Sequence, residues 1–189
     1  MCGIIGPNGS GKSTFLRLLA GIFPPDKGSV FIYGRVVSLL TIGIGFHSHL
    51  TVKENVYING AILGMSKDEI DEKFAGIIEF SGLKQFLNSP VGILSSGMYV
   101  RLGFSTAFAL EPDIFFIDEI IYVADIVFRE KCINELIKQS ENKIILAVSH
   151  NMEIIKKICN TVIVLNKGRI QHIGKDVITG INYYNTMIR

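Results

Sequence analysis

Residues Gly6 to Thr14, GPNGSGKST, combine glycines with a lysine and hydroxyl side chains in the pattern G-x-x-x-x-G-K-[ST]. An apolar run before this segment and helix-spaced apolar residues after it predict a strand, a loop and a helix. Glycines allow successive backbone N–H groups to face one anion, and the positive end of the helix adds to the attraction. We therefore expect a bound phosphate group, although a purely structural glycine-rich turn is the alternative. The residues of this loop are Gly6, Pro7, Asn8, Gly9, Ser10, Gly11, Lys12, Ser13 and Thr14.

Within this loop, two side chains have distinct expected roles. The Lys12 ammonium is expected to reach the β- and γ-phosphates of a nucleotide, and the Ser13 hydroxyl is expected to coordinate Mg²⁺. The sequence thus predicts binding of a nucleoside triphosphate with Mg²⁺.

Two carboxylates, Asp118 and Glu119, follow the apolar run from Ile114 to Ile117. Ligands of open α/β sheets bind beyond the carboxyl ends of the strands, where these side chains are expected to lie. Asp118 suits the Mg²⁺ shell, directly or through water, and Glu119 suits a base that orients and deprotonates an attacking water. Without a phosphate-binding loop in the same chain, such an acid pair would indicate only a solvated strand end.

Polar residues mark two further positions. His150 follows the apolar run 144–149 and is a candidate sensor of the γ-phosphate, although a helix cap or a surface residue is the simpler alternative. Leu94-Ser95-Ser96-Gly97-Met98 precedes an apolar helical stretch from Tyr99 to Leu110. Small residues at a helix start indicate either a second anion site or an ordinary N-cap.

Around these residues, the hydrophobic pattern predicts an α/β fold. Compact apolar runs at 114–117, 144–148 and 161–165 are typical of strands buried on both faces of a parallel sheet. Shorter runs at Val30 to Tyr33 and Val36 to Leu40 predict two strands around Gly34. We expect a mainly parallel sheet flanked by helices.

The region from about 51 to 110 is expected to form an inserted helical subdomain. Ser66 and Glu69 predict a capping box, and the helix it opens has one apolar face, formed by Ile70, Phe74, Ile77 and Ile78. Asn166-Lys167-Gly168 predicts a hairpin turn into a strand near 169–173, and a helix is expected from about 175. The chain is thus one domain, 1–189, with a core at 1–50 and 111–174, a helical subdomain at 51–110 and a C-terminal helix at 175–189.

Composition excludes several classes of protein. The chain has 189 residues, of which 48% are hydrophobic and 19% charged, so it has the composition of a folded chain. A formal net charge of +2 is too balanced to predict nucleic-acid binding. We identify neither a membrane-spanning helix nor a signal peptide. Cys2, Cys132 and Cys159 are widely spaced and are expected to be reduced thiols.

Taken in order, GPNGSGKST, LSSGMYVRL, DIFFIDE and Ser149-His150 resemble the Walker A, signature, Walker B and switch-histidine motifs of ABC ATPases. Within that superfamily, LSSGMYVRLGFSTAFALEPDIFFIDE and GFHSHLTVKEN are similar to the ATP-binding subunits of bacterial polysaccharide exporters, which move O-antigen, teichoic acid or capsule chains. The resemblance implies ATP and Mg²⁺ as cofactors, ATP hydrolysis that powers export, and a P-loop fold of the ABC type.

The resemblance also implies partners. It places the signature residues against the γ-phosphate bound by a partner subunit in a head-to-tail homodimer, and it places Asp125 in the dimer-contacting loop. The signature residues are Ser95, Ser96, Gly97 and Met98. It further implies docking on an integral-membrane permease at the cytoplasmic face of the bacterial inner membrane, with no nucleic acid.

Three features depart from the family's pattern. There is no glutamine between residues 35 and 60, and His47 stands in the place of the coupling-loop Gln. The signature reads Ser-Ser-Gly-Met where LSGGQ is commoner. The chain also starts at the phosphate-loop strand, so we expect the N-terminal strands and an adenine-stacking aromatic to be missing, with an exposed sheet edge near Val30 to Tyr33.

Two alternatives to a polysaccharide-exporter ATPase therefore stay open. One is a truncated nucleotide-binding module with weak or no ATPase activity. The other is an ABC ATPase outside transport that acts on nucleic acid, which the near-neutral charge disfavours.

Overall fold

The computed structural model describes residues 1–39, 43–118 and 125–188. The chain forms two compact units, one made of residues 1–38, 113–120 and 133–189, and the other of residues 39–112 and 121–132. Over the described ranges, no helix has both the length and the hydrophobicity needed to span a bilayer.

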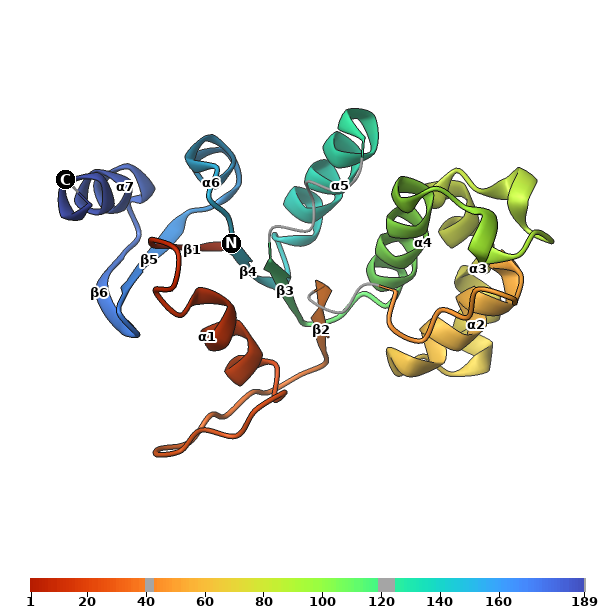
Figure 1. Ribbon diagram of the computed structural model, residues 1–189, viewed down its shortest axis with the longest axis horizontal. Coiled ribbons are helices and arrows are strands. Elements are labelled where there is room, and N and C mark those ends of the chain that lie inside the picture. The colour runs from red at the N-terminus through yellow and green to blue at the C-terminus, as the bar shows by residue number, and fades with distance from the viewer. Residues whose placement is uncertain (40–42, 119–124, 189) are drawn as a thin grey trace. The chain divides into compact units, whose positions relative to one another are not determined.

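The first unit is built on a six-stranded sheet with the order β2-β3-β4-β1-β5-β6 (Figure 1). Strands β1 to β5 run parallel to their neighbours, and β6 pairs with β5 in the antiparallel sense. The expected α/β class with a mainly parallel sheet is confirmed. The strands are β1 (Cys2–Ile5), β2 (Val36–Ser38), β3 (Ile114–Asp118), β4 (Ile144–Val148), β5 (Thr161–Asn166) and β6 (Arg169–Gly174).

Strand β1 lies near the centre of this sheet, between β4 and β5, and its side chains are buried on both faces. Helix α1 (Lys12–Leu19) covers one face, and α6 (Met152–Ile158) and α7 (Val177–Met187) cover the other (Figure 1). Complete burial of an aliphatic side chain contributes about 1.5–3 kcal/mol, so this core holds β1 firmly. The cluster on the α6 and α7 side contains Ile5, Ile155, Val162, Val164, Val177 and Ile181. The loop that follows β1 therefore starts from a rigid point.

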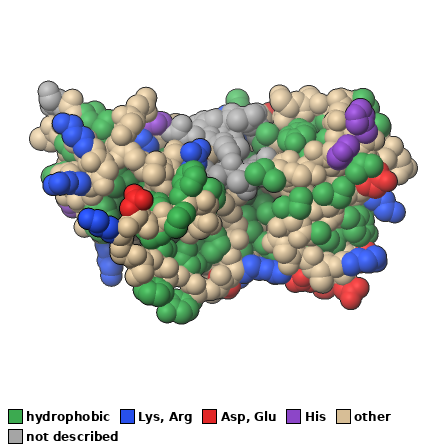
Figure 2. Space-filling view, turned by 60° about the horizontal axis from the view of Figure 1, so that its bottom comes forward, with side chains coloured by type: hydrophobic (Ala, Val, Ile, Leu, Met, Phe, Trp, Pro, Cys, Tyr) green, Lys and Arg blue, Asp and Glu red, His purple; other side chains and the backbone are tan. Residues whose placement is uncertain are grey.

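The prediction of a strand at Val30 to Tyr33 is wrong. This segment lies outside the strands, and the side chains of Phe31 and Tyr33 are 76% and 87% exposed. Hydrophobic side chains are visible at the surface of this unit at the lower left of Figure 2. Asp113 fixes where β2 begins, because its carboxylate accepts a hydrogen bond from Arg35 N over 2.8 Å, and Arg35 O in turn accepts one from Asp113 N over 2.9 Å.

The hairpin and the last helix of the first unit form where the sequence predicts them. Strands β5 and β6 pair up to Asn166 and Arg169, which leaves two residues in the turn. Helix α7 begins after Asp176, whose side chain accepts a hydrogen bond from Ile178 N over 3.0 Å. All three cysteines are free thiols, and burial raises the pKa of Cys159 to about 12.

The second unit contains the helices expected within residues 51–110, and it extends beyond those bounds, to 39–112 and 121–132. It contains α2 (Val52–Ile62), α3 (Lys67–Ser81), α4 (Ser96–Ala109) and the first turns of α5 (Ile126–Gln139), which continues into the first unit. The expected capping box of Ser66 and Glu69 opens α3, and a second box of Thr51 and Glu54 opens α2. Aromatic rings from α3, α4 and α5 pack together at centroid distances of 5.6 to 6.4 Å: Phe80, Phe104, Phe108 and Phe128.

Candidate phosphate-binding site

The glycine-rich loop connects the carboxyl end of β1 to α1, as the sequence predicts. At Gly6 the chain passes so close to β5 that a Cβ atom would lie 2.2 Å from the carbonyl oxygen of Leu165. Ser10 N donates to Pro7 O over 3.1 Å, and Gly11, with φ of 101°, precedes the first helical residue. Glycine favours this left-handed conformation because it has no side chain. The loop thus curls tightly over the start of α1.

Lys12 lies inside this curl, and only 6% of its surface is exposed. Its ammonium group donates to the carbonyl oxygens of Gly6 over 2.9 Å and of Pro7 over 3.0 Å. These bonds hold the ammonium beside the loop's backbone N–H groups and the start of α1, both of which attract anions. The arrangement therefore favours an anionic ligand.

A cavity of about 250 Å³ lies against the loop. Its walls bring together the ends of β1, β3 and β4, because the carboxyl ends of parallel strands meet at one edge of a sheet. The lining residues are Asn8, Gly9, Gly11, Lys12, Ser13, Thr14, Asp118, Val148 and His150. The phosphate loop, the first acid of the Asp-Glu pair and the candidate sensor histidine therefore share one cavity.

Ser13 and Asp118 provide oxygen atoms suited to a magnesium ion in this cavity. Ser13 Oγ donates to Asp118 Oδ2 over 3.0 Å. Mg²⁺ prefers oxygen ligands and is commonly held by one or two protein groups, waters and substrate phosphates. A hydroxyl and a carboxylate at this separation fit that ligand set. Within the described ranges, no cluster of three or more His, Cys, Asp or Glu side chains forms a separate metal site.

Glu119, the expected base, lies outside the described residues. Asp118, which directly precedes it, is the last residue of β3.

In the second unit, the signature segment forms the start of α4. Ser95 is the N-cap, and its Oγ accepts a hydrogen bond from Met98 N over 3.3 Å. Ser95 and Ser96 are exposed, and a Cβ atom at Gly97 would meet no atom within 4 Å. The ordinary N-cap and the anion site are compatible, since the cap uses one N–H group and leaves open space above Gly97.

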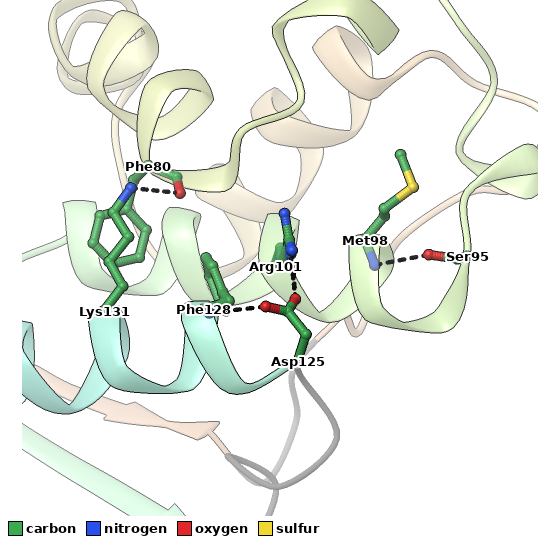
Figure 3. Close-up of polar contacts among 7 residues, drawn as sticks. All are labelled: Phe80, Ser95, Met98, Arg101, Asp125, Phe128 and Lys131. Atoms are coloured by element: carbon green, nitrogen blue, oxygen red, sulfur yellow. Dashed lines mark hydrogen bonds and ion pairs between the residues drawn. The ribbon is translucent and has the colours of Figure 1, made fainter.

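Asp125 connects α5 to this helix (Figure 3). Its Oδ1 accepts a hydrogen bond from Phe128 N over 3.0 Å, and its Oδ2 pairs with the guanidinium of Arg101 on α4. The backbone hydrogen bond from Phe128, followed by the bond from Arg101, holds the pKa of Asp125 below its ordinary value. Arg101 also lies over the ring of Phe128, with 5.4 Å from Cζ to the centroid.

His47 belongs to a loop of the second unit that Asn55 organises. Asn55 Oδ1 accepts from His47 N over 2.6 Å, and Asn55 Nδ2 donates to the carbonyl oxygens of His47, Leu50 and Thr51. The buried amide therefore fixes the backbone of this loop, while the His47 side chain is exposed.

Sequence reasoning missed two contributors, Arg101 and the turn residue Gly168. Arg101 follows Gly97 by one helical turn, so its place on the signature helix could have been noticed. Gly168 N donates to Ser10 O over 2.9 Å, and this contact between backbone atoms cannot be predicted from residue types.

Comparison with known proteins places the chain in a family. Residues 1–121 match the family described as ABC transporter, and the chain belongs to this family. It is 45% identical over 172 residues to the O-antigen export system ATP-binding protein RfbB of Klebsiella pneumoniae, covering 90% of this chain and 70% of that protein. The expected family resemblance is confirmed.

Other relatives have related names. The chain is 40% identical over 186 residues to the ABC transporter protein AbcA of Aeromonas salmonicida, with 98% of this chain and 60% of that protein covered. It is 38% identical over 174 residues to the teichoic acids export ATP-binding protein TagH of Listeria innocua, with 92% and 52% covered. A solved ATP-binding subunit of an ABC transporter has the same fold, with a TM-score of 0.81, 24% identity, and 92% of this chain and 78% of that one covered.

Proposed function

We propose that this chain is the ATP-binding and ATP-hydrolysing subunit of an ABC transporter that exports a cell-surface polysaccharide. The observation that carries the proposal is the single cavity shared by Lys12, the Ser13–Asp118 pair and His150. The substrate class rests on relatives named as exporters of O-antigen and teichoic acids.

Lys12, Ser13, Asp118 and His150 of the cavity, together with Glu119, have roles in phosphoryl transfer. Backbone N–H groups of the loop and the Lys12 ammonium would bind the β- and γ-phosphates, and Ser13 and Asp118 would hold Mg²⁺. When bound, Mg²⁺ neutralises part of the phosphate charge. Glu119 orients the water that attacks the γ-phosphorus in line and accepts its proton, and His150 donates to a γ-phosphate oxygen.

The signature segment completes the site of a second subunit. In a head-to-tail homodimer, the exposed start of α4 faces the γ-phosphate held by the partner's loop, and its uncapped N–H groups are donors for that anion. Asp125 then lies in the loop at the dimer contact. The dimer docks on a permease subunit at the cytoplasmic face of the inner membrane, with His47 in the coupling loop.

A gene-replacement experiment tests the transport function. Cells whose copy of this gene is replaced by the Lys12→Ala variant should retain the polysaccharide inside and lose it from the surface, whereas the wild-type gene restores export. Normal surface polysaccharide in Lys12→Ala cells, with the variant protein present at the wild-type level, contradicts the proposal. Extraction of both pools with quantification of the sugar provides the measurement.

A further inference from the structure

The turn between β5 and β6 lies directly against the phosphate-binding loop. Gly168 N donates to Ser10 O over 2.9 Å. Two further contacts join the same elements: a Cβ atom at Gly11 would lie 3.6 Å from Gly168 Cα, and one at Gly6 would lie only 2.2 Å from Leu165 O. The loop is thus in backbone-to-backbone contact with this hairpin.

The two-residue turn has an unfavourable residue at one of its two central positions, Lys167. Lys167 and Gly168 have φ values of 48° and 72°, so both central residues are left-handed, as a type I′ turn requires. Asn-Gly is the preferred pair for such a turn, and a lysine in the left-handed region is unfavourable. The turn is tight in spite of Lys167, and in this form it places Gly168 N 2.9 Å from Ser10 O.

The backbone hydrogen bond from Gly168 N to Ser10 O holds Ser10 in place. The Ser10 side chain is 2% exposed, and its buried hydroxyl has no hydrogen-bond partner among the described residues. Ser10 N bonds within the loop, to Pro7 O. The carbonyl oxygen of Ser10 is thus the atom through which the hairpin fixes this part of the loop.

Because the direction of the Ser10 carbonyl is fixed, the direction of a backbone N–H that can donate to a phosphate is fixed as well. The peptide between Ser10 and Gly11 is planar and trans, so the Ser10 C=O and the Gly11 N–H point in opposite directions. Because the carbonyl points to Gly168, the Gly11 N–H points away from the hairpin, and Gly11 lines the cavity. If this peptide turned over, it would present a partially negative oxygen to a phosphate in place of a donor.

We propose that the turn from Asn166 to Arg169 is a positioning element that presets the Gly11 N–H for phosphate binding through the bond from Gly168 to Ser10. The inference rests on the proposed nucleotide binding at this loop. Residues 166–169 are not among those that line the cavity, so the turn acts on the loop's donor geometry rather than on the chemistry.

A lengthened turn tests the proposal. Inserting Gly-Gly between Lys167 and Gly168 keeps both strands but releases the bond to Ser10. The matched control inserts Gly-Gly between Glu141 and Asn142, in the exposed connection from α5 to β4. Calorimetric titration should show Mg-ATP binding weakened by about 3- to 10-fold in the turn variant, as for loss of one hydrogen bond, and by less than about 2-fold in the control.

A ligand-free readout separates this inference from the proposed function. The residual dipolar coupling of the Gly11 N–H reports the direction of that bond without nucleotide. We expect one fixed direction in the wild type and the control, and an averaged value in the turn variant. Equal couplings and equal dissociation constants in all three proteins overturn the positioning role. Absence of ATP binding by the wild type counts against the proposed function, and the couplings still decide this inference.

A second variant removes only the N–H of Gly168. It keeps the proposal testable if the protein with the inserted residues fails to fold. Ligation of a synthetic segment starting at Cys159 allows the amide of Gly168 to be replaced by an ester in the full chain. An ester at Ile188, whose N–H bonds to Tyr184 O at the end of α7, is the control. Weaker Mg-ATP binding and an averaged Gly11 coupling only in the Gly168 ester support the proposal, and identical behaviour of the two esters overturns it.

Discussion

Ser13 Oγ donates a hydrogen bond to Asp118 Oδ2 over 3.0 Å, although the two residues lie 105 positions apart in the sequence. The start of α1 and the end of β3 supply one oxygen atom each to the same cavity. The pair forms the strongest link between the fold and its proposed metal chemistry, because these are the ligand types that Mg²⁺ accepts.

The Ser13→Ala variant removes the hydroxyl of this pair. We expect the Mg²⁺ concentration needed for half-maximal ATP hydrolysis to rise by about 10- to 100-fold, in line with losses seen when groups around a metal are removed. Ser13→Thr, which keeps the hydroxyl, is the matched control. A Mg²⁺ titration of ATPase activity that gives the same midpoint for Ser13→Ala and wild type argues against a metal at this pair.

The Asp125 carboxylate gives the second unit a pH dependence. Its pKa is lowered in the folded chain, first by the bond from Phe128 N and then by Arg101, so the charged form is favoured by folding. Its contribution is therefore present above the unfolded pKa, about 3.9, and is lost as pH falls through the lower folded pKa.

We accordingly expect Asp125→Asn to lower the urea midpoint of the second unit at pH 6, and to lower it by less at pH 2. Tryptophan is absent from the chain, so amide hydrogen exchange of α4 and α5 provides the measurement. Asp26→Asn, at an exposed position in the first unit, controls for the change in net charge. The same loss of stability at both pH values would show that the effect is steric.

Lys167 is one of two non-glycine residues at positive φ within the described residues. Replacing it by asparagine gives the Asn-Gly pair that type I′ turns prefer, so Lys167→Asn should stabilise the first unit by about 1 kcal/mol. Thermal unfolding of both chains measures the shift. Lys175→Asn, an exposed lysine after β6, is the control, and a lower midpoint for Lys167→Asn than for that control contradicts the turn assignment.

How far the sequence predicts this molecule depends on the range of the interactions involved. The apolar runs that form β3, β4 and β5 can be predicted from the sequence alone, because a strand buried on both faces is apolar throughout. Val30 to Tyr33 is equally rich in strand-forming residues, yet it forms no strand. Strand formation needs a partner, and a partner is not encoded in the run itself.

The same distinction holds for the candidate site. Lys12, Asp118 and His150 are residue types with recognisable chemistry, and they line one cavity. Gly168 and Ser10 act through backbone atoms, which every residue has, so no pattern of residue types could have identified their contact. The pairing of Arg101 with Asp125 depends on how α4 and α5 pack, which only the structure provides.

Shared sites in the proposed dimer can be tested with two inactive chains. Gly97 has open space around its Cβ position, so Gly97→Asp should fold while placing a negative charge toward the partner's γ-phosphate. Mixed with Lys12→Ala, it should restore one intact composite site per heterodimer and part of the ATPase activity. Mixtures in which heterodimers are shown to form, but which stay inactive, argue against sites completed in trans.

The most direct test of the central claim compares Mg-ATP binding and hydrolysis by the wild-type chain and the Lys12→Ala variant. Lys12 is buried against the carbonyl oxygens of its own loop and faces the cavity, so its loss should abolish turnover and remove most γ-phosphate binding while ADP binding is weakened less. Arg17→Ala, at the other end of α1, controls for loss of a positive charge on the same helix. We predict hydrolysis by the wild type and the control and none by Lys12→Ala; equal rates in all three proteins would contradict the assignment of this loop as the ATP site.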